Sequence, residues 1–171
     1  MATTVLTVGV AALAQLFAIS TRANFSAKTT TAASILAQQK MEQLRGLTWG
    51  FDTLGLPLSD YSTDVTVVPE TPTGGRGLTP SPGDSLKTNA DGYCDFLDRY
   101  GNSLGGGVVA PVGTVYVRRW SVEPLPTNPN NTLILQVLVS QPKDRSDDLT
   151  TNTRRLPDEA RIISVKTRKA Q

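Results

Sequence analysis

The acidic side chains that could bind a cation, or act as a general acid and base, lie in two short clusters. These clusters are Asp91, Asp95 and Asp98, and Asp144, Asp147 and Asp148. Carboxylates bind calcium when they follow the spacing of a calcium-binding loop, and neither cluster has that spacing. Both clusters lie among turn-forming residues, where Asp is favoured for its own hydrogen bonding to the backbone. We therefore expect a solvated turn at each place rather than an ion site.

Nucleophilic and metal chemistry are limited by the absence of histidine from the chain. Without an imidazole there is no common base for a Ser or Cys nucleophile and no His ligand for zinc. Cys94 is the only cysteine, so we expect it to be a small buried residue on a strand. Gly105–Gly107 lacks the Lys-Ser/Thr pair of a phosphate-binding loop and predicts a flexible turn. We therefore expect no enzyme activity, no metal and no cofactor.

The strongest pattern in the chain is an apolar N-terminal segment, residues 1–22, in which Arg22 is the first charged residue. A helix needs about 20 apolar residues, or roughly 30 Å, to cross the hydrocarbon of a bilayer. This segment therefore predicts a membrane-spanning or filament-core half-helix. Its principal apolar side chains are Val5, Leu6, Val8, Val10, Leu13, Leu16, Phe17 and Ile19.

The helical pattern continues without a proline through residues 23–48, now with one apolar face. Lys28, Lys40 and Glu42 are the charged residues that we assign to the other faces. The helix is expected to end near Gly46 or Gly50, because Gly readily takes the conformation that follows a helix. The apolar face predicts packing against a domain, and it consists of Ala33, Leu36, Ala37, Met41, Leu44 and Leu47.

Residues 49–171 are rich in Pro, Gly, Thr and β-branched residues, a composition that favours strands and loops. Strands are predicted near residues 63–68, 93–97, 102–104, 114–122, 132–141 and 161–167, the last through Ile163 and Val165. Residues 54–61 are expected to be irregular, and residues 70–90 to form a flexible loop. The economical topology is an antiparallel meander. The predicted fold class is α+β, with the second half of a long helix packed on a small antiparallel sheet.

Residues 33–45, Ala-Ser-Ile-Leu-Ala-Gln-Gln-Lys-Met-Glu-Gln-Leu-Arg, join the apolar helix to the β-rich region. This arrangement resembles the minor pilins of type IV pili and the minor pseudopilins of type II secretion, and residues 36–45 are its most specific part. Three later pieces are similar to the type IV pilus modification subgroup. These are Gly92-Tyr93 with Asp95, Asp98 and Gly101; Val117-Arg118-Arg119-Trp120-Ser121-Val122; and the closing residues 162–169.

The resemblance implies a pilin-like structural subunit that helps to initiate, cap or modify a type IV pilus or type II secretion filament. Its implied location is the bacterial inner membrane, with one span and a periplasmic domain, and then the assembled filament. Its implied partners are other pilins or pseudopilins, inner-membrane assembly proteins and membrane lipid, with no small-molecule substrate. Family members carry a leader that ends in Gly before a Phe-Thr-Leu-Ile-Glu-like start, and neither precedes Val5. We therefore expect Met1 to lie several residues inside the mature helix.

Three other interpretations of the sequence stay open. The apolar segment could be a cleaved signal peptide or a plain membrane tether, although no basic residue precedes it. An exported β-rich binding or adhesion module could use Tyr116, Trp120 and the loop at 70–90 as a ligand surface. A DNA-binding role would use the basic residues near the end of the chain, but the net charge of +2 is small. Those residues are Arg154, Arg155, Arg161, Lys166, Arg168 and Lys169.

Overall fold

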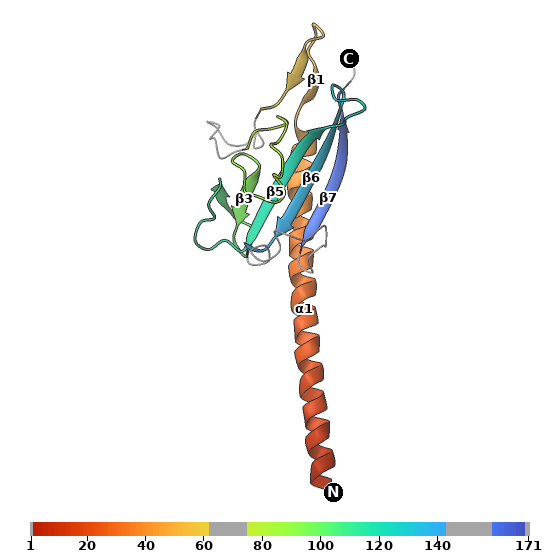
Figure 1. Cartoon of the computed structure of the whole chain (residues 1–171), viewed down its shortest axis with the longest axis vertical. Helices are drawn as coiled ribbons and strands as arrows, with labels where there is room; N and C mark the ends of the chain where they lie inside the picture. Colours follow the sequence, from red (N-terminus) through yellow and green to blue (C-terminus); the bar gives the residue numbers. More distant parts are fainter. Residues whose placement is uncertain (1, 62–74, 143–158, 170–171) are drawn as a thin grey trace.

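One long helix runs through more than a quarter of the chain and projects beyond the rest of the molecule (Figure 1). The computed structural model describes residues 2–61, 75–142 and 159–169. The helix, α1 (Ala2–Gly46), has 45 residues, which corresponds to roughly 68 Å at 1.5 Å per residue. It is continuous between its apolar and amphipathic halves and ends at Gly46, with Arg45 in its last turn. A cation there suits the negative end of the helix dipole.

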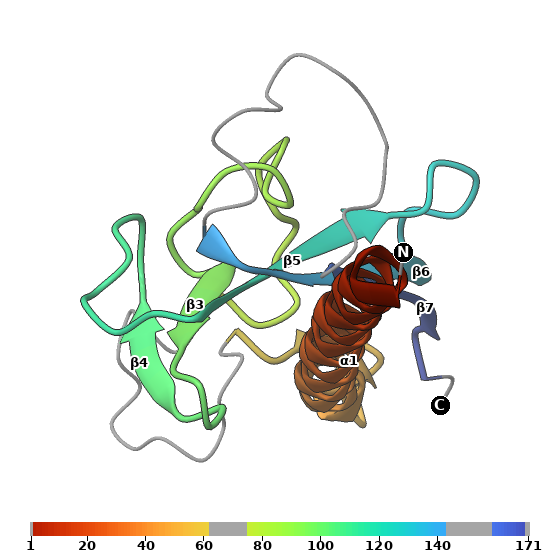
Figure 2. The ribbon, with the colours of Figure 1, turned by 90° about the horizontal axis from the view of Figure 1, so that it is seen from below.

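A five-stranded antiparallel sheet packs against the second half of α1, and its strand order is β4-β3-β5-β6-β7. The strands are β3 (Cys94–Leu97), β4 (Ser103–Gly106), β5 (Tyr116–Pro124), β6 (Thr132–Ser140) and β7 (Ala160–Thr167). The last three strands form the expected meander, and β3 pairs with the opposite edge of β5. Viewed along the helix, α1 lies on one face of the sheet (Figure 2), where it contacts β6 and β7 most extensively. The predicted α+β fold class is confirmed.

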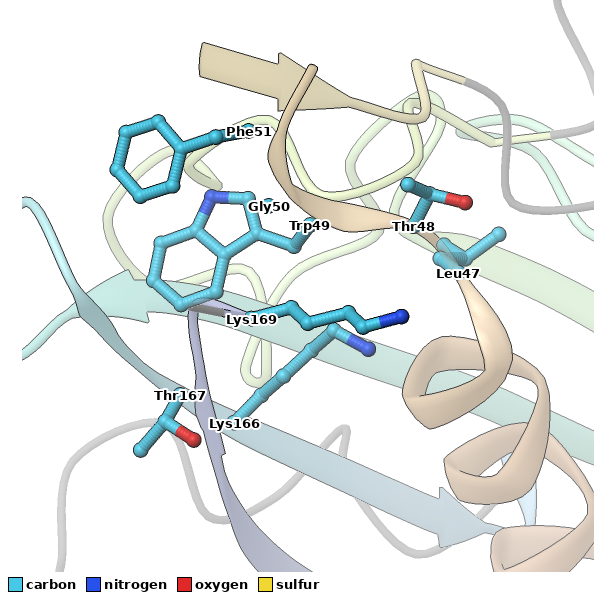
Figure 3. A pocket seen from close by; sticks show the side chains of 8 residues that line it. All are labelled: Leu47, Thr48, Trp49, Gly50, Phe51, Lys166, Thr167 and Lys169. Carbon is cyan, nitrogen blue, oxygen red and sulfur yellow. The ribbon is translucent and has the colours of Figure 1, made fainter. Parts of the chain in front are cut away.

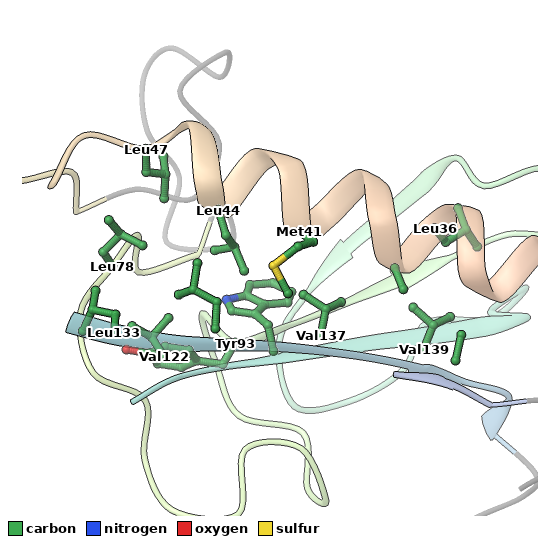
Figure 4. Packing of buried hydrophobic residues seen from close by; sticks show 14 of the residues in the cluster. Leu36, Met41, Leu44, Leu47, Leu78, Tyr93, Val122, Leu133, Val137 and Val139 are labelled. Atoms are coloured by element: carbon green, nitrogen blue, oxygen red, sulfur yellow. The ribbon is translucent and has the colours of Figure 1, made fainter. Parts of the chain in front are cut away.

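The core lies between this sheet and α1 (Figure 4). Because side chains alternate along a strand, β5 and β6 each direct one set of residues toward the helix. The set comprises Tyr116, Trp120 and Val122 from β5 and Leu133, Leu135, Val137 and Val139 from β6. The other face of the sheet carries a smaller buried cluster of Cys94, Phe96 and Val117. The two-layer arrangement therefore buries both faces of the central strands.

The edge strand β7 confirms the strand predicted near residues 161–167. Ile163 and Val165, on which the prediction of this strand rested, are exposed on the face away from α1. Ala160 and Ile162 pack against the core instead. The alternation along a strand shows which residues share a face. The pairing of β7 with β6 decides which of its two faces is covered by α1.

A short hairpin of β1 (Trp49–Phe51) and β2 (Pro57–Ser59) extends from the end of the helix. The sequence analysis placed irregular structure over residues 54–61, so β2 corrects it. Asp52 organises the turn, since its Oδ1 accepts hydrogen bonds from the amides of Leu54 and Leu56 at 2.9 and 2.8 Å. Pro57 is tolerated because β2 is an edge strand.

The other predicted turns and loops have mixed outcomes. Gly101 has a φ of 85° in the turn between β3 and β4, as expected for this hairpin. Gly105 and Gly106 belong to β4 and not to a flexible turn. The strand predicted at residues 63–68, and the start of the predicted loop at 70–74, lie outside the described residues.

The described part of the predicted loop, residues 75–90, is attached to the domain. Leu78 lies in the core cluster, and its amide donates to the carbonyl of Asp60 at 3.0 Å. The amide of Ser81 donates to the carbonyl of Val122 at 2.9 Å. Tyr93 completes the attachment, since its hydroxyl lies 3.0 Å from the carbonyl oxygens of Thr79 and Pro80. Residues 75–90 are therefore held against the domain, whereas their Pro and Gly content predicted a flexible loop.

Candidate functional site: a helix with two surfaces

The first half of α1 has no cover within the described part of the molecule. It projects away from the domain in Figure 1, and its large apolar side chains are exposed. Those with described side chains are Leu6, Val8, Val10, Leu13, Leu16, Phe17 and Ile19, each between 57 and 72% exposed. Val5 lies in the helix, but its side chain is outside the described residues.

Two physical facts make this surface a candidate functional site. An apolar surface of this size is not stable in water without a partner. α1 is also the one helix in the described chain that is long and apolar enough to cross a membrane, and none of its most apolar window is buried in the protein. The helix is therefore compatible with a membrane anchor, although a signal sequence has the same length and composition.

Contact with the domain begins near Thr29, which is the first buried residue of α1. Its hydroxyl donates within the helix, to the carbonyl of Ser26 at 2.9 Å and that of Phe25 at 3.2 Å. Arg22 and Lys28, the first charged side chains, lie just before this point. The change from uncovered to covered helix therefore occurs within about two turns of the first charges.

The second half of α1 places its predicted apolar face against the sheet (Figure 4). All six residues are buried, with exposures of 8% or less: Ala33, Leu36, Ala37, Met41, Leu44 and Leu47. Full burial of a Leu or Met side chain contributes about 1.5 to 3 kcal/mol. Packing of this face therefore fixes the direction in which the uncovered half projects.

A buried ionic cluster of Lys40, Asp95 and Arg118 joins α1 to the sheet. The Arg118 guanidinium binds Asp95 in a fork, with Nε to Oδ1 at 2.9 Å and Nη2 to Oδ2 at 2.7 Å. Arg118 Nη1 donates to the carbonyl of Leu36 on the helix at 3.1 Å. Lys40 Nζ lies 3.5 Å from Asp95 Oδ2 and 3.9 Å from the centre of the Trp120 ring. The cluster thereby binds helix, β3 and β5 together.

This cluster corrects two expectations. Lys40 was assigned to the exposed faces of the helix, yet it is only 4% exposed. Its position, four residues after Leu36 and four before Leu44, lies within the apolar face and could have revealed this. Asp95 was expected in a solvated turn, but it is a buried residue of β3.

The remaining acidic candidates do not converge on a cation site. Asp98 caps an exposed turn by accepting from the amides of Tyr100 and Asn102, and the Asn102 side chain lowers its pKa most. Asp91 lies at the surface, 3.9 Å from Arg76. No cluster that could hold a metal occurs among the described residues. Asp144, Asp147 and Asp148 lie outside them.

Cys94 is buried on β3, as the sequence analysis expected. Its Sγ donates to the carbonyl of Gly107 at 2.8 Å. Burial raises the pKa of its thiol, and the nearby Arg119 opposes that effect only partly. The thiol therefore stays protonated at neutral pH and contributes packing rather than nucleophilic chemistry.

The aromatic residues of the alternative interpretations are buried, and two of the basic residues contact other side chains of the protein. Tyr116 and Trp120 are 6 and 1% exposed, so neither offers a ring to a ligand. Arg161 hydrogen-bonds the side chain of Gln136, and the Arg168 guanidinium lies over the rings of Trp49 and Phe51. Arg154 and Arg155 lie outside the described residues.

A cavity of about 370 Å³ lies at the far end of α1 from the uncovered half (Figure 3). The end of the helix, strand β1 and the end of β7 surround it. Its lining residues are Leu47, Thr48, Trp49, Gly50, Phe51, Lys166, Thr167 and Lys169. The molecule therefore has a polar, partly aromatic recess at one end and a bare apolar helix at the other.

Comparison with known proteins adds no relative to this description. No protein-family model matches the chain, and no curated protein or solved structure matches it.

Proposed function

We propose that this protein is a membrane-anchored subunit of a pilin-like filament, of the minor pilin or minor pseudopilin kind. The uncovered half of α1 holds the subunit in the bacterial inner membrane, with the domain in the periplasm. On assembly the same half packs against the helices of other pilins or pseudopilins in the core of a type IV pilus or type II secretion filament. The subunit helps to initiate, cap or modify that filament, and it performs no catalysis.

The observation that supports this proposal most is the continuity of α1. A cleaved signal peptide has no reason to continue in phase into a helix that is built into a domain. Here one unbroken helix joins an apolar half to six buried side chains and to the Lys40–Asp95–Arg118 cluster. Because of this rigid connection, the domain and the apolar half of α1 move together. A subunit that passes from the membrane into a filament needs such a connection.

Small residues along the uncovered half favour helix association over a plain tether. Ala and Gly allow helix backbones to approach closely within a membrane, where apolar burial gives little driving force. The uncovered half contains Ala2, Gly9, Ala11, Ala12, Ala14 and Ala18. No Cβ placed at Gly9 would meet another described atom, so that position is open to a neighbouring helix.

Substitutions in the uncovered half separate anchoring from assembly. We expect Leu13→Arg to abolish retention in carbonate-washed membranes, because a charge at the centre of a span costs about 2.5 to 3.5 kcal/mol. Gln38→Arg, on the exposed side of the domain half, is the matched control and should leave retention unchanged. Gly9→Leu should keep membrane retention but lower recovery of the subunit in sheared filaments, because it blocks close approach of helices.

Two results would contradict the proposal. One is a mature N-terminus near Asn24 by mass spectrometry together with release from the membrane, which would favour an exported module. The other is an unsubstituted chain that is retained in the membrane but is absent from sheared filaments. That result would favour a plain tether.

A further inference from the structure

The cavity at the end of α1 lies at the edge of the main core, which contributes Leu47 and Trp49 to its lining. We call it the distal groove, defined by its lining residues Leu47–Phe51, Lys166, Thr167 and Lys169. Figure 1 shows that this end of the molecule is opposite the N-terminus. The groove is therefore far from the apolar half of α1.

Positive charge dominates the distal groove. The side chains of Lys166 and Lys169 extend to the same side of it (Figure 3). Lys166 Nζ donates to the Arg45 carbonyl at the end of α1. Among the described residues, no carboxylate lies within ion-pair distance of either lysine. Burial, and then the charge of Arg45, lower the pKa of Lys166, and the carboxylate of Asp60 opposes this shift only partly. An arriving carboxylate would add a second counter-charge to the lysines.

Arg168 adds a third cation beside the groove and orders its aromatic wall. Its guanidinium lies 4.9 Å from the centre of the Trp49 ring and 5.0 Å from that of Phe51. Its Nε is buried and has no hydrogen-bond partner within the described residues. The amide of Lys169 donates to the Trp49 carbonyl at 3.0 Å, so the backbone that carries these cations is fixed to β1.

The hairpin beside the groove supplies apolar side chains. Gly50 lies closely against the last described residues, since a Cβ at Gly50 would lie 3.3 Å from the Cβ of Lys169. Leu58 is paired directly with Gly50 across the hairpin, and directly opposed residues place their side chains on the same face. Leu58 is 49% exposed, and Leu54 and Leu56 in the same hairpin are exposed as well. An aliphatic surface thus adjoins the lysines.

We propose that the distal groove binds an acidic, apolar segment of a partner polypeptide, with a carboxylate between Lys166 and Lys169 and an aliphatic side chain against the exposed Leu58. Charge complementarity selects the acidic group. The exposed leucines favour a polypeptide over an acidic glycan or a free phosphate, because neither of these would cover aliphatic side chains. This inference does not depend on the filament role, since the groove lies entirely within the domain.

A binding experiment on the full chain in detergent micelles tests the proposal. The probe is a fluorescently labelled acetyl-Leu-Glu-Val-Glu-Leu-Glu-amide, and the matched control peptide has Gln in place of each Glu. We expect the acidic peptide to bind at least about tenfold more tightly, as for the loss of a charged hydrogen-bond partner. Lys169→Gln and Leu58→Ser should each weaken binding of the acidic peptide by about tenfold. Lys87→Gln, at an exposed lysine that pairs with Asp84, should not.

The variants must retain the circular dichroism spectrum and melting temperature of the parent chain. Leu58→Ser removes the apolar contact while leaving every charge in place, so loss of binding in both variants identifies this surface rather than a general attraction. Equal binding of the acidic and Gln peptides, or no binding of either, would overturn the proposal. Binding of inorganic phosphate or trigalacturonate as tightly as the acidic peptide would overturn the assignment to a polypeptide.

Discussion

At the scale of single residues, the decisive feature is the buried cluster of two cations and one carboxylate. Asp95 neutralises Arg118 through two short hydrogen bonds, and Lys40 rests on the face of Trp120 as well as near Asp95. A buried ion pair contributes little to stability compared with an apolar replacement, but it penalises every arrangement that leaves one charge alone. The cluster therefore favours one register of helix against sheet, because a helix rotated on the sheet would leave Asp95 without Lys40.

This charge balance predicts unequal effects of two substitutions. Asp95→Asn leaves the buried guanidinium of Arg118 without its carboxylate partner, and we expect it to lower the free energy of unfolding by about 3 to 5 kcal/mol. Lys40→Met keeps the apolar stem over Trp120 and leaves the Arg118–Asp95 pair intact, so its cost should be below about 1.5 kcal/mol. Urea unfolding of the full chain in mild detergent measures both. Equal costs for the two variants would show that the carboxylate has no special role.

At the scale of elements, α1 is one continuous helix whose two halves have different surfaces. The first half depends on its surroundings for cover, whereas the second half is fixed by side chains from β5 and β6. Hydroxyl side chains mark the region between them, where Thr29, Thr31 and Ser34 each donate to a carbonyl in the preceding turn. These bonds satisfy the hydroxyls within the helix, which is unbroken through the boundary.

Substitutions along the second half should show this division of faces. We expect Leu44→Ala to cost about 2 to 5 kcal/mol of unfolding free energy, because Leu44 is fully buried in the core. Ile35→Ala, at an exposed apolar residue of the same helical half, should change stability by less than about 0.5 kcal/mol. Denaturant unfolding monitored by circular dichroism compares the two. A large cost at Ile35 would mean that its face is covered in the folded protein.

At the scale of the whole molecule, the packed domain and the uncovered half-helix are joined end to end and share no core. Every described core residue lies at or after Ala33 in the chain. The domain therefore carries its own stability, and the uncovered half contributes association with lipid or other helices. The distal groove lies at the opposite end, so the rod separates the two candidate interaction surfaces.

Removal of residues 1–24 should accordingly leave a folded, soluble, monomeric domain. We expect its unfolding free energy to agree with that of the full chain within about 1 kcal/mol, because every described side chain that the deletion removes is exposed. Size-exclusion chromatography should give a monomer without detergent, whereas the full chain should need detergent to stay dispersed. Loss of cooperative unfolding in the shortened protein would show that the uncovered half supports the domain.

Local patterns in the sequence were enough to predict the long helix, its end near Gly46 or Gly50, its buried face and the meander of β5, β6 and β7. Helix and strand periods depend on residues close together in the chain, so they can be read without knowing what lies opposite. Tertiary structure alone decided that Lys40 is buried beside Asp95, that Ile163 and Val165 face outward, and that Gly50 lies against Lys169. Each of these outcomes depends on a residue distant in the chain, whose position is set by strand register and helix packing, and no local pattern records that position.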